Sequence, residues 1–401
     1  MNDYLLIYIS VFLTITCNQP DSKGSGEIYL LKPALVEKSL VLSSYIYDLE
    51  FIPLEEHSEN LLRYAPKILI KDSLIIVRDK VSRSKYVYFF NQSGKFLYKD
   101  NHVPDDFPGE SYADFDFMDF TLNPDKGVLY MTDVSRHCII EYDLKNKNKS
   151  VVMRGIDAFN LFYHKNTIYA YTPRSENGLL TIIDANDFNI KGEYVYEKDL
   201  ERGRGAIISN PIALWRDTVF FGIFFSDTIY YHGEKGIQPY AVLGNSPATS
   251  VRYISMEQFQ EVYFGQNKAD RFPNMAIPWG ELSFWEDVWF LHMVNHKYLL
   301  WDRKSGLSVL LPFYGIKNTR NLLSEAGGLT KIFKTGEYYY SYINLTEEFY
   351  SQAKELLESD NDHSMKPALM SLLDEYPPER NFQNPVITRF KIRDDFMDAF
   401  R

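Results

Sequence analysis

Two stretches of the chain share one pattern: "LIIVRDKVSRSKYVYFF" at residues 74–90 and "VLYMTDVSRHCIIEYD" at residues 128–143. Each has an apolar run, an Asp, a Val-Ser-Arg turn and then a second run with alternating apolar residues. Short apolar runs on either side of a polar turn predict a β-hairpin. The sequence therefore contains the same strand–turn–strand unit at least twice.

The same unit continues along most of the chain. Units of this kind occupy residues 67–99, 120–152, 159–194, 212–243, 280–313 and, in part, 327–345. Short antiparallel strands that recur every ~40–50 residues are typical of the blades of a β-propeller. Because neighbouring blades cover both faces of each sheet, the strands are expected to be nearly continuous apolar runs. The sequence thus predicts an all-β, six-bladed β-propeller.

Two regions break the strand pattern, and two strands have no hairpin partner. Residues 255–271 and 345–376 show helical periodicity, which predicts helical insertions, the first between blades four and five and the second inside blade six. Lone strands are expected at 48–56 and 384–393. Pairing a strand from each chain end in one blade would close the ring and remove an exposed sheet edge.

The N-terminus has the features of an export signal. An apolar run from Leu5 to Ile15 has the length of a signal-peptide core and is too short to span a bilayer. It ends near Cys17, so the segment resembles a bacterial lipoprotein signal, in which the Cys is lipidated; a plain cleaved signal peptide and a buried strand are the alternatives. The expected organisation is a signal peptide at 1–17, a linker and N-terminal extension at 18–44, and one propeller domain at 45–401.

Composition excludes some classes of function. The formal net charge is -11 and no basic stripe is present, which argues against nucleic acid as a partner. The two cysteines are Cys17 and Cys138, so the mature domain has no disulfide framework. Cys138 falls within a predicted strand and is expected to behave as a small buried hydrophobe. The 30 Tyr and 28 Phe residues favour sheet.

Several motifs link the chain to a known family. The stretches are "LEFIPLEE" (49–56), "GKFLYK" (94–99), "FPGESYADFDFM" (107–118), "GVLYMTDVSRHCIIEYDLKNK" (127–147) and "NPVITRFKI" (384–392). With them, the chain is similar to a six-bladed β-propeller family abundant in Bacteroidetes and distantly like NHL-repeat propellers, over roughly residues 45–395. The resemblance implies secreted or lipid-anchored proteins, often encoded beside glycan-uptake systems. It implies no defined reaction.

One face of the predicted propeller is a candidate binding surface. The turns that link blades and the turns between second and third strands emerge there, and they carry the following basic residues: Arg83, Arg136, Arg174, Arg202, Arg204 and His296. A ring of guanidinium groups would clamp a carboxylate or sulfate, whereas the alternative is that Val-Ser-Arg makes a solvated turn. Tyr112 and Trp279, with Trp215 and Trp285, would stack on sugar rings or else pack between blades.

Motifs for catalysis or for cofactors are absent from the sequence. There is no Gly-x-Ser-x-Gly elbow and no Gly-rich phosphate loop. His292 and His296 lie four residues apart without a third ligand at a telling spacing, and Asp114 with Asp116 fits a turn better than a calcium loop. No catalytic residue, metal or cofactor is therefore predicted.

Three functions stay open at this stage, one of which is assembly through the two helical insertions, whose apolar stripe would contact a partner. The first is a non-catalytic binding or scaffold propeller of the cell envelope, whose partner is a glycan, a peptide or another envelope protein. It would touch the membrane only through a lipid anchor, on the periplasmic side or the outer-membrane surface. The alternative is a propeller hydrolase or lyase acting on carbohydrate or lactone-like substrates. Acidic or His side chains that converge at the funnel mouth would favour the enzyme.

Overall fold

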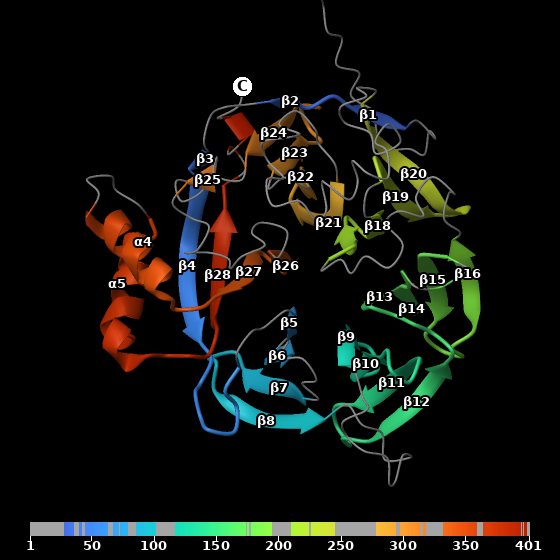
Figure 1. Ribbon diagram of the computed structural model, residues 1–401, viewed down its shortest axis with the longest axis horizontal. Helices are drawn as coiled ribbons and strands as arrows, with labels where there is room; N and C mark the ends of the chain where they lie inside the picture. The colour runs from blue at the N-terminus through green and yellow to red at the C-terminus, as the bar shows by residue number, and fades with distance from the viewer. Residues whose placement is uncertain are drawn as a thin grey trace, which may run out of the picture.

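Six β-sheets of four or five strands each surround a central axis in this computed structural model (Figure 1). The structure describes residues 28–35, 40–41, 45–62, 67–71, 73–78, 86–101, 117–173, 175, 178–194, 210–223, 226–244, 278–293, 297–312, 316–317, 332–358, 364–393, 395 and 397–398. Each sheet is one blade, and its strands follow one another from the axis outwards. The predicted six-bladed β-propeller is confirmed.

The first three blades each use four consecutive strands. Blade one contains β5 (Lys67–Lys71), β6 (Leu74–Arg78), β7 (Tyr86–Asn91) and β8 (Phe96–Asn101). Blade two contains β9 (Phe117–Asn123), β10 (Val128–Asp133), β11 (Cys138–Asp143) and β12 (Lys149–Arg154). Blade three contains β13 (Asn160–His164), β14 (Thr167–Tyr171), β15 (Leu180–Asp184) and β16 (Ile190–Tyr194). The two stretches that repeat in the sequence are therefore the middle strands of blades one and two.

Blades four and five are built in the same way. Blade four contains β17 (Ile212–Trp215), β18 (Thr218–Gly222), β19 (Thr228–Gly233) and β20 (Gly236–Leu243). Blade five contains β21 (Pro278–Trp285), β22 (Val288–Met293), β23 (Lys297–Asp302) and β24 (Ser308–Pro312). Most middle strands of the blades are largely buried, as in β10, where all six residues are buried; β19 of blade four, with two buried residues, is an exception. Both faces of such a strand are covered by neighbouring blades, which explains its continuous apolar sequence.

Blade six closes the ring with strands from both ends of the chain. Its order is β26 (Phe333–Thr335), β27 (Tyr338–Ile343), β28 (Val386–Ile392) and β4 (Ile46–Pro53). β28 and β4 are antiparallel, with Val386 opposite Pro53 and Thr388 opposite Phe51. This pairing confirms the expected closure by the two lone strands.

A closure junction, formed by Glu55, Gly94 and Asn384, ties blade six to blade one. The Asn384 side chain is inaccessible to solvent; its Oδ1 accepts the Leu62 N–H at 2.8 Å and its Nδ2 donates to the Glu55 carbonyl at 2.8 Å. Glu55 N donates to the Gly94 carbonyl at 2.8 Å. Gly94 has φ +79°, and a Cβ there would lie 2.1 Å from the Pro53 oxygen. The motifs "LEFIPLEE", "GKFLYK" and "NPVITRFKI" therefore meet at one junction.

Three short strands of the N-terminal segment add to the outer edges of the ring. β1 (Tyr29–Leu31) pairs with β20, β2 (Ala34–Leu35) with β24, and β3 (Leu40–Val41) with β25 (Ile316–Lys317), all in parallel. We call β1, β2 and β3 together the N-terminal strap. The strap lies within the 18–44 segment, and its strands were not predicted because two or three residues carry no readable period. It covers sheet edges that would otherwise expose unpaired backbone groups.

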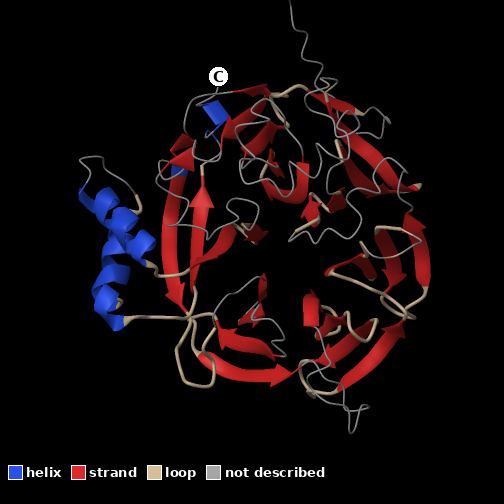
Figure 2. Cartoon of the chain, viewed as in Figure 1, coloured by secondary structure: helices blue, strands red, loops and turns tan. Residues whose placement is uncertain are grey.

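Two helices between β27 and β28 pack on the outside of blade six. α4 (Glu347–Glu358) and α5 (Lys366–Glu375) are followed by the 3₁₀ helix η7 (Pro378–Arg380), and they lie beside β4 at the rim of the ring (Figure 2). Thr346 Oγ1 accepts the Phe349 N–H at 3.2 Å, so it caps α4. Phe349, Ala353 and Leu369 are buried against the blade. These helices confirm the insertion at 345–376; the one at 255–271 lies outside the described residues.

The interior confirms the interpretation of the lone core cysteine. Cys138 is fully buried in β11, within the apolar layer between blades one and two, and it forms no disulfide. Burial, with a smaller contribution from Asp133, raises the pKa of its thiol to about 12. The thiol therefore packs as a hydrophobe and is a poor nucleophile. Among the described residues, no helix is both long and apolar enough to cross a membrane.

Candidate functional site

Most residues of the predicted arginine ring cannot be placed. Arg83, Arg174, Arg202, Arg204, Tyr112, His296, Cys17 and the side chain of Trp279 lie outside the described residues. Arg136 follows β10, and its N–H donates to Asp133 Oδ1 at 3.1 Å, while Ser135 Oγ donates to the same oxygen at 2.8 Å. In blade two, Val-Ser-Arg is thus a turn bonded to the preceding Asp. The arginine ring as a binding surface stays a prediction.

The two other tryptophans considered for sugar stacking pack between blades. Trp285 is 1% exposed, and its ring centroid lies 6.0 Å from that of Tyr339 in blade six. Trp215 is half-buried, and its Nε1 donates to the Glu286 carbonyl at 2.6 Å. Trp215 in blade four therefore holds a turn of blade five. For these two residues the packing alternative is confirmed.

Charged residues on the inner strands of the blades form ion pairs and hydrogen bonds with one another. Lys67 Nζ lies 2.8 Å from Asp119 Oδ2 and 3.1 Å from the Leu161 carbonyl, so it joins blades one, two and three. His292 Nδ1 lies 2.8 Å from Glu281 Oε2 within blade five. Asp119 and Glu281 are buried. Within the described ranges, no group of three His, Cys, Asp or Glu residues could hold a metal ion.

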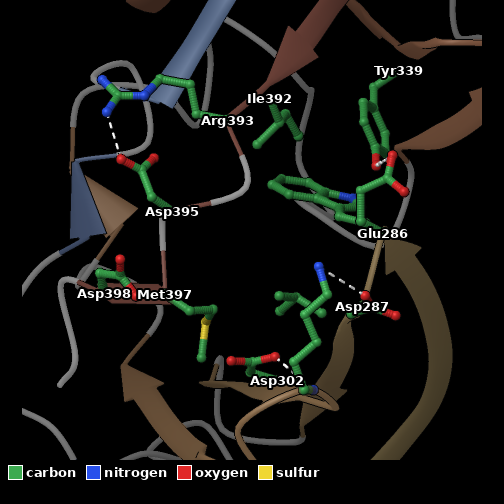
Figure 3. Close-up of a pocket in the computed structure, with 12 residues that line it drawn as sticks. Glu286, Asp287, Asp302, Tyr339, Ile392, Arg393, Asp395, Met397 and Asp398 are labelled. Atoms are coloured by element: carbon green, nitrogen blue, oxygen red, sulfur yellow. Dashed lines mark hydrogen bonds and ion pairs between the residues drawn. The ribbon is translucent and has the colours of Figure 1, made fainter.

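A pocket lies between blades five and six, at the rim where the turn between the first and second strands of blade five emerges. Its volume is about 290 Å³ (Figure 3). Two turns of blade five, the start of β27 and the residues after β28 form its walls. The lining residues are Trp285, Glu286, Asp287, Val288, Asp302, Lys304, Tyr339, Ile392, Arg393, Asp395, Met397 and Asp398.

Glu286 is held as an anion at one side of the pocket. It belongs to the turn between β21 and β22 and has φ +53°, the left-handed conformation that such two-residue turns use. Its Oε1 accepts hydrogen bonds from Lys334 Nζ and, at 3.1 Å, from Tyr339 Oη. Burial alone would raise the pKa of Glu286, but the bond and charge of Lys334, helped by Tyr339, lower it overall.

Asp287 and Asp302 form a second, more buried side of the pocket. Asp287 Oδ1 accepts from Arg216 Nη2 at 2.6 Å, and its Oδ2 lies 3.1 Å from Lys304 Nζ. Asp302 ends β23, and its Oδ1 accepts the Lys304 N–H at 2.9 Å. The Asp287 side chain is 9% exposed, whereas that of Lys304 is 67% exposed. Lys304 is thus the solvent-facing donor of this wall.

The chain end forms the third side. Arg393 Nη2 lies 2.5 Å from Asp395 Oδ2, and Met397 is buried beneath them (Figure 3). Met397 and Ile392 join Trp285 and Val288 as the apolar part of the lining. The whole lining carries five carboxylates and two cationic groups, so the pocket combines ionised acceptors and donors with an apolar floor.

Sequence analysis missed this pocket. In the sequence, Glu286 and Asp287 stand as a short polar turn after Trp285, but nothing there marks them as part of a cavity. The run "IRDDFMD" at 392–398, which follows the last strand, mixes charged and apolar residues and is the nearest thing to a signal. Its packing against blade five depends on ring closure and is not encoded in any local period.

In size and chemistry the pocket fits a small polar ligand. Its volume lies near the lower end of the ~300–1,000 Å³ typical of small-molecule sites. Ionised acids and bases make stronger hydrogen bonds than neutral groups, and an apolar floor can take the face of a ring. No Ser, Cys or His is among the described residues of its lining.

Comparisons with known proteins agree with the fold. Residues 31–391 match the profile of a family described as "Domain of unknown function (DUF4934)". A candidate exported protein from Bacteroides fragilis is 13% identical, with a TM-score of 0.63 over 92% of this chain and 100% of the other. None of the curated proteins compared with the chain matches it.

Two further solved structures overlap less well. Virginiamycin B lyase from Staphylococcus aureus is 12% identical, with a TM-score of 0.43 over 73% of this chain and 81% of that one. BamB from Moraxella catarrhalis is 11% identical, with a TM-score of 0.39 over 66% of each chain. Likeness at these identities concerns the fold alone, and the last two are too distant to bear on function.

Proposed function

The chain belongs to the DUF4934 family, and from that premise we propose that it is a non-catalytic binding propeller of the bacterial cell envelope. Its ligand is a sugar residue of a glycan, held in the pocket between blades five and six. The signal-like segment at 1–17, and the fold shared with a candidate exported protein of Bacteroides fragilis, support an exported location. Cys17 is the proposed site of the lipid anchor.

The observation that carries the proposal is the lining of the pocket. Neutral hydroxyl groups both donate and accept, so they match a lining with Asp302 and Lys304 on one side and the Arg393–Asp395 pair on another. The apolar face of a sugar ring would lie against Met397 and Ile392. A folded protein partner is a poorer fit, because a stable protein interface buries at least ~1,200 Å² in total and this site is a small cavity.

The lowered pKa of Glu286 supports a binding role for this residue over a role as the acid of a hydrolase. Glycoside hydrolysis uses one carboxylic acid whose pKa is raised, so that it donates a proton to the leaving group. The pKa of Glu286 is lowered instead, and Asp287 is bonded to two cations, Arg216 and Lys304. Glu286 therefore suits ionic and hydrogen-bonded contacts to a ligand rather than proton donation.

The chain offers a matched pair of variants to test the site. Lys304 and Lys145 both lie two residues after the Asp that ends a third strand, and both backbone N–H groups bond to that Asp. Lys304 lines the pocket; Lys145 does not. Glycan-array screening followed by calorimetry on the glycans bound should show about tenfold weaker binding for Lys304→Ala and none of this loss for Lys145→Ala.

Three outcomes would contradict the proposal. One is an array on which no glycan binds. Another is an equal loss of affinity in both lysine variants, since that would place the ligand away from the pocket. The third is release of products from a bound glycan, which would favour the alternative of a hydrolase or lyase.

A further inference from the structure

A single aromatic residue fixes the start of the N-terminal strap to the ring. Tyr29 of β1 lies 5.1 Å from Tyr240 and 5.2 Å from Trp301, centroid to centroid. Its Oη accepts a hydrogen bond from Arg303 Nη2 at 3.0 Å. Leu30, the next residue, is 48% exposed. Tyr29 and the buried Leu31 therefore make the inward contacts of β1, and Tyr29 is the one that reaches Arg303.

Aromatic rings from the strap, from blade four and from blade five surround the guanidinium of Arg303. Its guanidinium carbon lies between 4.6 and 5.8 Å from the centroids of Tyr29, Trp215, Tyr240, Trp289 and Trp301. Within the described part of the chain, its Nε and Nη1 are buried and have no hydrogen-bond partner. The ring faces are thus the main compensation for its lost hydration, and each such contact contributes more when it is desolvated.

The same arginine is bonded to the pocket. Arg303 lies between Asp302 and Lys304, which line the cavity. The backbone N–H of Arg303 donates to the Asp287 carbonyl at 2.9 Å. Trp215, one of the rings around Arg303, donates its Nε1–H to the carbonyl of Glu286. Arg303 therefore contacts both turns of blade five that form the pocket wall.

We propose that Tyr29 is a positioning residue for the pocket: through Arg303 it holds the 286–287 and 302–304 turns in the arrangement that the cavity requires. The strap, which follows the predicted lipid anchor in sequence, is then coupled to the pocket. This coupling deepens the proposed function, because it makes ligand binding depend on whether the strap is docked.

Hydrogen–deuterium exchange of the full chain tests the coupling without any ligand. Tyr29→Ala should accelerate exchange of peptides covering 286–288 and 302–304 about tenfold, which corresponds to the loss of a desolvated cation–π contact. Tyr29→Phe keeps the ring and should restore most of the protection. Leu30→Ala changes the neighbouring exposed strap residue and should leave both peptides unchanged.

The inference fails if Tyr29→Ala frees only the strap, with exchange at 286–288 and 302–304 as in the wild type. It also fails if exchange rises equally in blade two, for example over 128–143, since the effect would then be global. Arg303→Lys should reproduce the local acceleration from the other side of the contact. Because no sugar is needed, these outcomes are independent of the glycan screen, and either proposal can fail alone.

Discussion

The closure junction and the pocket lie on opposite sides of blade six. Their polar groups differ in charge and in exposure to solvent. At the junction, Asn384 is neutral, fully buried and hydrogen-bonded on both sides of its amide. In the pocket, Glu286 and Lys304 are ionised and keep 49% and 67% of their side chains exposed. Buried, satisfied amides add stability and specify one geometry, whereas exposed charges remain available to a ligand.

The comparison also separates two kinds of sequence motif. Three of the five stretches that carry the family resemblance contribute Glu55, Gly94 and Asn384 to the junction. Their chemistry is explained by closing the ring, so the resemblance predicts the fold and says little about the ligand. A functional difference between related propellers would then be sought in turns such as 286–287 and in the residues after the last strand.

The strongest test of the junction is Gly94→Ala. The new Cβ would meet the Pro53 oxygen at 2.1 Å, and φ +79° disfavours any side chain. We expect the free energy of unfolding to fall by about 3–5 kcal/mol, measured by urea denaturation. Gly127→Ala is the control: its φ is +67° but nothing lies within 4 Å, so only about 1 kcal/mol should be lost. Equal losses of unfolding free energy in the two variants would show that the contact with the Pro53 oxygen adds nothing to the cost of the substitution.

A somewhat smaller effect is expected from Asn384→Ala. The substitution leaves the Leu62 N–H and the Glu55 carbonyl without the side chain that now bonds them. Leaving buried backbone groups unsatisfied should cost about 2–4 kcal/mol of unfolding free energy. Asn146→Ala, at an exposed turn, serves as the reference. If thermal unfolding showed both variants to be equally stable, water would have to replace the amide at no cost.

The smallest expected effect concerns Glu286 and pH. Its pKa is lowered from the ordinary 4.5, so its stabilising interaction is present above that pH and is lost as the pH falls through the lowered value. Glu286→Gln should therefore lose a few tenths of a kcal/mol at neutral pH, about the size for an exposed pair, and match the wild type in acid. Stability curves measured from neutral pH down to about 3 would show this convergence; parallel curves would contradict it.

Local patterns account for much of the architecture. Alternation and turn residues in 74–90 and 128–143 indicated hairpins, and the recurrence of the unit indicated blades. The two lone strands indicated how the ring closes, and helical periodicity located α4 and α5. The strap was beyond such reasoning, because strands as short as Ala34–Leu35 exist only through the edges they pair with.

The sequence by itself determined the repeated unit, the closure by both chain ends and the burial of Cys138, because each follows from the period of apolar residues along a strand. Only the tertiary structure decided that Glu286, Lys304, Tyr339 and Arg393 share one pocket. Their meeting depends on how blades five and six stack and where the last residues pack after closure. That is a property of the ring as a whole, and no local pattern of residues carries it.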